Sequence, residues 1–296
     1  MLNFITFPFY KNGNYISAKQ NKYNLINHKN NDDHLQKIYQ EKYDYTLVFR
    51  ADEYDDDLLL NLKQNSKKMI AFHWDGLKRT PNIFSKIKYF DTFFSFDPMD
   101  AINNNLKFIT NFYFDVIDIK ESKKTKWDLT YIGYFTTKRF DILHQLSDHN
   151  SSVITNFILK AFSHHDRLLL QSSNTIKDLH HFYTYSELLK IHNESNVILD
   201  LKADIHDGLS FRFFECIQLN KKIVTTNTHV KKYDFYNPNN ILVLNDNLDN
   251  DIKEFINTPF VDYTDDIKNK YSFSNWFENI IESKNCIPIH NPYLNV

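Results

Sequence analysis

The stretch of residues 197–227 constrains the fold of this chain more than any other part of the sequence. It begins with a short apolar run at residues 197–201, of the kind that a buried parallel strand needs. A loop with Gly208 follows, then helical residues 210–219 and a second apolar run at residues 222–225. This order of strand, loop, helix and strand predicts a parallel sheet. The loop then lies at the carboxyl ends of the strands, where α/β sheets bind ligands.

The first half of the chain alternates between expected strands and expected helices. This alternation indicates a parallel sheet with helices on both of its faces. Asp97 and Pro98 mark one helix start, because aspartate caps a helix and proline fits the first helical position. The expected strands are residues 2–7, 45–50, 68–73 and 92–96, and the expected helices are residues 33–41, 55–64, 83–88 and 98–104.

A lysine-rich strip at residues 120–126 separates two strand-rich halves. We interpret it as a linker between domains, and the alternative is an ordinary surface loop. The second half restarts the alternation, although residues 150–182 show no readable pattern, and Thr184 and Glu187 have the spacing of a capping box. The other expected elements are strands at 129–133 and 241–244 and helices at 138–146, 186–192, 248–256 and 272–283.

The composition of the chain argues against several classes of protein. The net charge is −2 over 296 residues, whereas a nucleic-acid binder would carry a strongly basic surface. The two cysteines, Cys216 and Cys286, indicate neither a disulfide framework nor a zinc site. The sequence shows no basic leader and no run of about 20 apolar residues, so we expect a cytoplasmic protein without a membrane span.

Three segments resemble bacterial GT-B glycosyltransferases of the kind that build capsule, lipopolysaccharide and exopolysaccharide. They are HDGLSFRFFE at residues 206–215 with KKIVTTN at 221–227, WDLTYIGYFTTKR at 127–139, and YFDTFFSFDPMDA at 89–101. The resemblance implies an α/β fold with two Rossmann-like domains facing a cleft. The expected parts are an acceptor-binding domain at residues 1–120, a nucleotide-sugar donor domain at 127–270, and a C-terminal helix and tail at 271–296 that cross back to the first domain.

The resemblance implies an enzyme that moves a sugar from a nucleotide-sugar donor to a capsule or lipopolysaccharide acceptor. The donor is a substrate, and we expect neither a cofactor nor a metal ion. The implied partners are the donor and a glycan or lipid-linked glycan, without nucleic acid, and with peripheral contact at the cytoplasmic face of the inner membrane. The alternative is a non-catalytic protein that binds a nucleotide sugar or scaffolds a polysaccharide assembly complex. An epimerase is disfavoured, because the chain has no GxGxxG fingerprint.

The resemblance also implies a set of donor-binding residues. Glu215 is expected to accept hydrogen bonds from the ribose hydroxyls, and the alternative is a surface glutamate paired with Arg212. Arg212 would bind a phosphate through its planar guanidinium group. Backbone N–H groups at the start of the helix would face the diphosphate. The full set is Gly133, Arg139, Lys202, His206, Gly208, Leu209, Ser210, Arg212 and Glu215.

An inverting transfer needs a general base, which the first domain would supply near the carboxyl end of a strand. The candidates are Asp75, His73 and Asp52, with Asp75 preferred and a plain turn at residues 74–76 as the alternative. The acidic run at residues 55–57 resembles the metal-binding DxD of other glycosyltransferases, but carboxylates also suit a helix start. We favour the helix start.

Two further groups of residues could bind a ligand or could simply form part of the solvent-exposed surface. Four cations lie close together in the sequence and could contact anionic lipid, although a solvated basic face is the favoured alternative. They are Lys78, Arg79, Lys86 and Lys88. The histidine pairs at residues 164–165 and 180–181 lack metal-ligand spacing, so we expect them to be structural or to face solvent.

Overall fold

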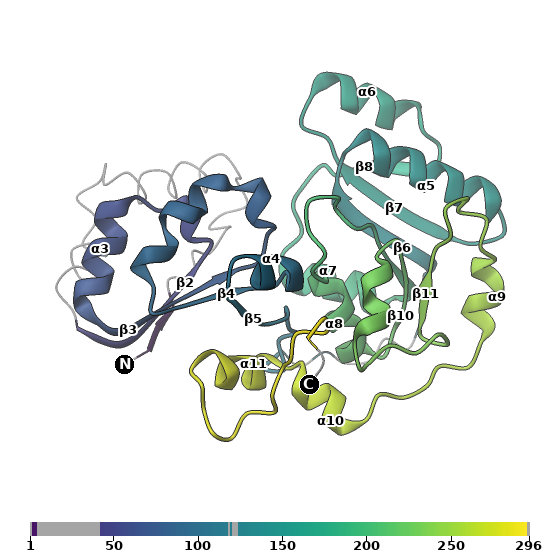
Figure 1. Cartoon of the computed structure of the whole chain (residues 1–296). Helices are drawn as coiled ribbons and strands as arrows, with labels where there is room; N and C mark the ends of the chain where they lie inside the picture. The colour runs from purple at the N-terminus through teal and green to yellow at the C-terminus, as the bar shows by residue number, and fades with distance from the viewer. Residues whose placement is uncertain (1, 5–41, 118, 120–123, 295–296) are drawn as a thin grey trace. The chain divides into compact units, whose positions relative to one another are not determined.

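The computed structural model describes residues 2–4, 42–117, 119 and 124–294 of the chain (Figure 1). The chain forms two compact units. The first unit comprises Met1–Asn111, Ala203–Gly208 and Glu278–Val296, and the second comprises Phe112–Lys202 and Leu209–Phe277. The helix expected at 33–41, strand residues 5–7 and most of the linker expected at 120–126 lie outside the described residues.

The first unit is built on a parallel sheet of five strands in the order β1-β2-β3-β4-β5. Each strand follows the previous one in sequence, so the sheet grows in one direction. The central strands are buried along most of their length, as a parallel sheet covered on both faces requires. The strands are β1 (Leu2–Phe4), β2 (Tyr43–Phe49), β3 (Ser66–His73), β4 (Thr92–Ser95) and β5 (Lys107–Phe108).

Short helices connect these strands. Asp55 and Asp97 cap α3 (Asp56–Asn65) and α4 (Pro98–Asn103) through their carboxylates, which confirms both helix starts. The helix expected at residues 83–88 is wrong in type, because the chain forms the 3₁₀ helices η3 (Pro81–Ser85) and η4 (Ile87–Tyr89) there. The backbone bonds of this segment span three residues, as from Lys86 N–H to the Ile83 carbonyl and from Tyr89 N–H to the Lys86 carbonyl, which is the pattern of a 3₁₀ helix. Two further 3₁₀ turns are η1 (Ala51–Glu53) and η2 (Leu77–Arg79).

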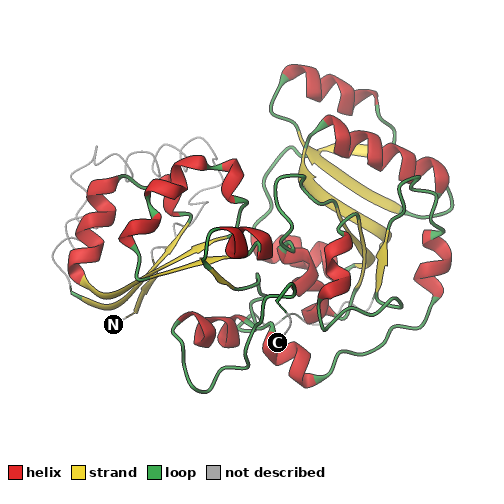
Figure 2. Ribbon diagram, viewed as in Figure 1, coloured by secondary structure: helices red, strands yellow, loops and turns green. Residues whose placement is uncertain are grey.

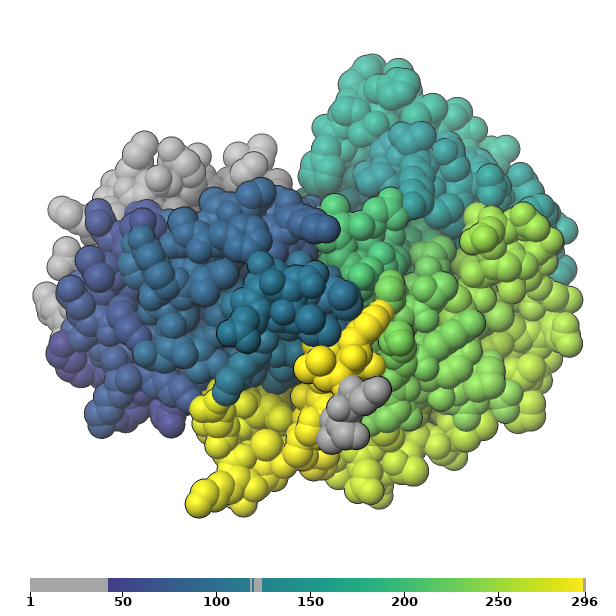
Figure 3. Space-filling view, viewed as in Figure 1, coloured from purple at the N-terminus to yellow at the C-terminus, as the bar shows by residue number. Residues whose placement is uncertain are grey.

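Residues 278–296, at the C-terminal end, belong to the first unit. Glu282 accepts hydrogen bonds from both Lys68 and Lys107, and Asn291 donates a bond of 2.9 Å to the Pro98 carbonyl. Figure 3 shows this segment (yellow) lying against blue residues of the first unit. The last part of the chain is therefore a structural component of a unit whose sheet is built from the beginning of the sequence.

The second unit contains a parallel sheet of six strands in the order β11-β10-β9-β6-β7-β8. In sequence order, β6, β7 and β8 extend the sheet in one direction. The chain then returns to the other side of β6, where β9, β10 and β11 extend the sheet in the opposite direction. This is the doubly wound Rossmann order, with the switch between β6 and β9. The strands are β6 (Trp127–Tyr134), β7 (Thr155–Lys160), β8 (Ile176–Asp178), β9 (Ser195–Asp200), β10 (Lys222–Thr225) and β11 (Ile241–Val243).

Helices join and cover these strands (Figure 2). The region at 150–182 without a readable pattern contains β7, α6 and β8, and the capping box of Thr184 and Glu187 is confirmed. The helix expected from residue 248 starts later, because Leu248 has a left-handed backbone (φ 56°) and Asp251 supplies the cap. The helices are α5 (Thr137–His149), α6 (His164–Ser172), α7 (Tyr185–Asn193), α8 (Phe211–Leu219), α9 (Ile252–Asn257), α10 (Asp265–Lys270) and α11 (Phe273–Ile280), with the 3₁₀ helix η5 (Thr228–Lys232).

Candidate functional site

The switch between β6 and β9 places several polar residues of the second unit together. These strands pair in parallel, so the end of β6 at Gly133 and Tyr134 and the end of β9 at Asp200 lie on the same edge of the sheet. Helices α5 and α8 follow the two strands and begin at this edge. In open α/β sheets a ligand binds outside the carboxyl ends at such a switch point.

Asp200 is the centre of the hydrogen-bond network at this edge. It is 2 % exposed, and its Oδ1 accepts a hydrogen bond of 2.6 Å from the Ser210 hydroxyl. Its Oδ2 accepts a bond of 3.1 Å from the Thr225 hydroxyl, and Arg212 Nη1 lies 3.5 Å from Oδ1. Ser210 is the N-cap residue of α8 but makes no capping bond with its side chain, which serves Asp200 instead. The carboxylate thereby fixes the start of α8 to the ends of β9 and β10.

The sequence analysis missed Asp200. A signal was present, because this aspartate is the one charged residue in the otherwise apolar run at 197–201, and it ends strand β9 at the edge where α/β proteins bind ligands.

Arg212 is held between strand ends rather than on the open surface of the helix. Its Nη2 donates a bond of 2.6 Å to the Ile132 carbonyl, and its guanidinium lies 5.2 Å from the centre of the Tyr131 ring. Its side chain remains 24 % exposed. One part of the guanidinium is therefore used by the protein, and the rest can meet an anionic ligand at the switch point.

Glu215 lies in a buried polar cluster between α7 and α8. It is 2 % exposed, and its Oε2 is 3.1 Å from Nδ1 of His192, at an angle that makes a contact but no hydrogen bond. Burial and the neighbouring carboxylate raise the pKa of the Tyr185 hydroxyl. The alternative of a surface glutamate paired with Arg212 is wrong, because the side chain points into the protein. Its role toward a ribose stays a prediction.

The other donor candidates divide between the two units. In the second unit, a Cβ atom at Gly133 would lie 2.6 Å from the Tyr131 hydroxyl, and Arg139 Nη1 donates to the Tyr134 carbonyl. Lys202 donates its backbone N–H to the Thr226 hydroxyl, and Leu209, which precedes Ser210, is buried.

His206 and Gly208 belong to the first unit. The imidazole of His206 packs edge-on against the Phe96 ring, with ring centres 4.9 Å apart. A Cβ atom at Gly208 would lie 2.6 Å from the same ring, so only glycine permits this approach of the backbone. Asp207 donates its backbone N–H to the Asp97 carboxylate over 2.5 Å. These contacts tie residues 203–208 to the end of β4.

The three candidate bases of the first unit lie together around Arg50. Its guanidinium donates to Asp52 over 2.8 and 2.9 Å and to Asp75 over 3.1 Å. Arg50 has a left-handed backbone (φ 53°), which is strained for a residue other than glycine, and the two carboxylates help to hold it. Arg79 is a second partner of Asp75 at 3.2 Å, and its own side chain is 57 % exposed.

His73 is the most deeply buried of these candidates. It is 0 % exposed, its Nδ1 lies 3.5 Å from Asp52 Oδ1, and its Nε2 is 3.2 Å from the Thr80 hydroxyl. Burial lowers the pKa of His73 to about 4, although the Asp52 charge opposes this. Burial alone would raise the pKa of Asp52, but the Arg50 hydrogen bond and charge turn the net shift downward. The cluster therefore holds a neutral imidazole between charged neighbours at neutral pH.

The acidic run at residues 55–57, the basic residue Lys86 and the histidine pairs have ordinary structural roles or lie on the surface. Asp55 caps α3, Lys86 pairs with Asp56, and both histidine pairs are exposed. Within the described part of the chain, no group of three or more His, Cys, Asp or Glu residues could hold a metal ion. Among the same residues no helix combines the length and apolar character needed to cross a membrane.

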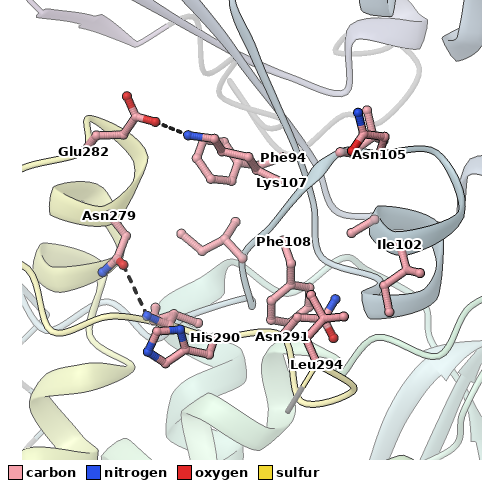
Figure 4. A pocket seen from close by; sticks show the side chains of 14 residues that line it. Phe94, Ile102, Asn105, Lys107, Phe108, Asn279, Glu282, His290, Asn291 and Leu294 are labelled. Atoms are coloured by element: carbon pink, nitrogen blue, oxygen red, sulfur yellow. Dashed lines mark hydrogen bonds and ion pairs between the residues drawn. The ribbon is translucent and has the colours of Figure 1, made fainter. Parts of the chain in front are cut away.

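A cavity of about 500 Å³ lies elsewhere in the first unit, between α4, β5 and the C-terminal segment (Figure 4). Phe108, Ile102 and Leu294 line it, and the Lys107–Glu282 pair lies at its side. None of the predicted donor or base residues lines this cavity. The chemistry of the charged clusters, rather than the size of this cavity, therefore identifies the candidate sites.

Comparison with known proteins gives structural matches only. No family model matches the chain, and no curated protein matches its sequence. Among solved structures, OtsA in its apo form is 12 % identical, with 92 % of this chain and 79 % of that chain covered and a TM-score of 0.51. A UDP-forming α,α-trehalose-phosphate synthase from Burkholderia xenovorans, in complex with glucose-6-phosphate, is 13 % identical over 80 % of this chain and 75 % of that one, with a TM-score of 0.50.

An α-glucosyltransferase in complex with UDP and a 13-mer DNA is also similar. It is 13 % identical over 72 % of this chain and 70 % of that one, with a TM-score of 0.50. Likeness at this level of identity establishes the fold alone. The two parallel α/β sheets and these neighbours confirm the predicted fold class: the chain has the two-domain, Rossmann-like GT-B fold.

Proposed function

We propose that this protein is a glycosyltransferase that moves a sugar from a nucleotide-sugar donor to a surface-polysaccharide acceptor, either capsule or lipopolysaccharide. The observation that carries the proposal is the Ser210–Asp200–Arg212 network at the switch point of a doubly wound sheet, in a chain with the GT-B fold. The structural neighbours support the same class, because they include a UDP-forming synthase and a glucosyltransferase bound to UDP.

In this proposal the second unit binds the donor. Arg212 neutralises phosphate charge, and the backbone N–H groups at the start of α8 face the diphosphate near Ser210. Gly133 lets the chain approach the phosphates at the end of β6, and Arg139 adds a cation beside it. The resemblance assigns the ribose hydroxyls to Glu215, whose carboxylate lies beside His192 between α7 and α8. Because the cations and the helix start balance the leaving diphosphate, the transfer proceeds without a metal ion.

The first unit supplies the acceptor side. Asp75 remains our preferred general base, because its side chain is 11 % exposed, against 5 % for Asp52 and 0 % for His73. Arg50 positions Asp75 through its bond to Oδ2. The acceptor is a glycan or a lipid-linked glycan, and the protein works at the cytoplasmic face of the inner membrane. The exposed Lys78 and Lys88 belong to the surface that would approach anionic lipid.

Nucleotide binding by the purified chain tests the donor site. Isothermal titration with UDP, GDP and CMP should reveal a ligand, and Arg212→Leu should weaken its binding at least tenfold. Arg167→Leu is the matched control, because Arg167 is 50 % exposed on α6 and should leave the affinity unchanged. A wild-type protein that binds none of these nucleotides would contradict the proposal.

Donor turnover then separates an enzyme from a non-catalytic nucleotide-sugar binder or scaffold. We expect release of the nucleoside diphosphate from the matching sugar nucleotide, with activity retained in EDTA. Asp75→Asn should lower kcat with little change in nucleotide affinity, since it lies in the acceptor unit. Binding without any turnover, with or without candidate acceptors, would favour the scaffold alternative.

A further inference from the structure

Two aromatic side chains of the second unit are exposed and touch each other. Tyr134 is 50 % exposed and Phe162 is 61 % exposed, and their ring centres are 5.3 Å apart with an angle of 44° between the planes. Exposed aromatic rings are ordinary when they are single. Each residue of this contacting pair keeps at least half of its surface open to solvent, so the pair offers an exposed aromatic platform.

The pair stands at the carboxyl edge of the sheet. Tyr134 ends β6 and is the register partner of Lys160, which ends β7 two residues before Phe162. Strands β6 and β7 are neighbours on the side of the switch point away from β9. The platform is therefore adjacent to the strand end that carries Gly133, and it continues the candidate donor site along the same edge.

The loops around the platform are fixed by specific contacts. Lys160 donates to the Leu179 carbonyl over 2.9 Å and lies 5.2 Å from the centre of the Phe182 ring, so the loops after β7 and β8 are joined. Arg139 donates to the Tyr134 carbonyl over 3.2 Å, which places a guanidinium beside the platform. The first turn of α5 contains no acidic residue, and it carries Lys138 and Arg139. An anionic group is thus favoured next to the rings.

We propose that Tyr134 and Phe162 stack on the nucleobase of the donor. A ligand that suits this edge is planar and apolar at one end and anionic at the other, which is the chemistry of a nucleoside diphosphate. Stacking of a base on an aromatic side chain stabilises the complex and tolerates different bases. The inference rests on the proposed function, since it extends the same donor site from the phosphates to the base.

The test compares nucleotide and pyrophosphate binding in matched variants. Tyr134→Ala and Phe162→Ala should each raise the dissociation constant for the nucleotide bound by the wild type, among UDP, GDP and CMP, by about tenfold. Phe162→Tyr keeps a ring and should stay within about twofold of wild type. Ile154→Ala is the control, because Ile154 is equally exposed at 61 % but precedes β7, at the opposite edge of the sheet. Inorganic pyrophosphate has no base, so its affinity should not change in any variant.

Each outcome decides the proposal. Unchanged nucleotide affinity in both alanine variants would overturn the platform while leaving the proposed function intact. Equal weakening of nucleotide and pyrophosphate would also overturn it, because the rings would then support only the fold. If the wild type binds none of the three nucleotides, the platform and the proposed function fail together.

Discussion

Removal of the Asp200 charge should destabilise the second unit, and the size of the effect follows from burial. Asp200→Asn keeps the shape of the side chain but leaves Arg212 without its carboxylate. Breaking a fully buried ion pair costs about 3–5 kcal/mol, and an exposed pair contributes about 0–1 kcal/mol. The Asp200 side chain is 3 % exposed and that of Arg212 is 24 % exposed, so the pair falls between these limits. We expect a loss of about 2 kcal/mol in the free energy of unfolding.

A double-mutant cycle isolates the pair from its surroundings. Urea unfolding of wild type, Asp200→Asn, Arg212→Leu and the double variant should give a coupling free energy of about 1–2 kcal/mol. Circular dichroism and hydrogen exchange of the α8 amides would follow the transition and localise it. The Lys126–Glu194 pair serves as control, because its side chains are 49 % and 13 % exposed and its coupling should stay below about 1 kcal/mol. A coupling within about 0.5 kcal/mol of zero for Asp200 and Arg212 would refute the reasoning.

Two further predictions concern stability. The folded-state pKa of His73 is about 4, below its ordinary 6.5, so only the unfolded chain gains this proton as the pH falls from 6.5 toward 4. His73 should therefore contribute a stability loss of at most about 3 kcal/mol as the pH falls through that window, and almost none above about pH 7.5. Urea unfolding at several pH values should show this loss shrinking in His73→Gln but persisting in the exposed control His165→Gln. Lys222 is 6 % exposed and donates to the Phe255, Ile256 and Thr258 carbonyls at the end of α9. Lys222→Met should lower the free energy of unfolding by about 2–3 kcal/mol in thermal or urea unfolding. The control Lys253→Met, on α9, should lower it by less than about 0.5 kcal/mol. Equal effects of the two substitutions would exclude a role for these bonds.

The local pattern predicted much of the fold, because residues 197–227 carry their strand and helix signals within a short window. The order of the strands depends on pairings between distant residues, such as Trp127 with Ser195, which periodicity does not encode. Strand β5 has only two residues, and β8 has three, so neither leaves a readable alternation. Their positions are fixed by tertiary pairing.

The candidate site was predictable in part. The resemblance to GT-B glycosyltransferases indicated Ser210 and Arg212, and both lie at the switch point. Sequence spacing alone suggested that Arg212 and Glu215 share a helix face, but packing of α7 on α8 turns Glu215 inward toward His192. The exposed Tyr134 and Phe162 were not recognised, because an aromatic residue at a strand end looks the same in sequence whether it is covered or open.

The path of the chain between the two units limits how the protein can be divided. A fragment that stops at residue 111 would lack Asp207, which bonds Asp97, and also Glu282 and Asn291, which hold Lys68, Lys107 and the start of α4. Neither unit consists of one uninterrupted stretch of chain. A simple truncation would therefore remove hydrogen-bond partners from the remaining unit instead of isolating an intact domain. Expression of separate halves would need both residues 203–208 and the last nineteen residues, 278–296, joined to the first.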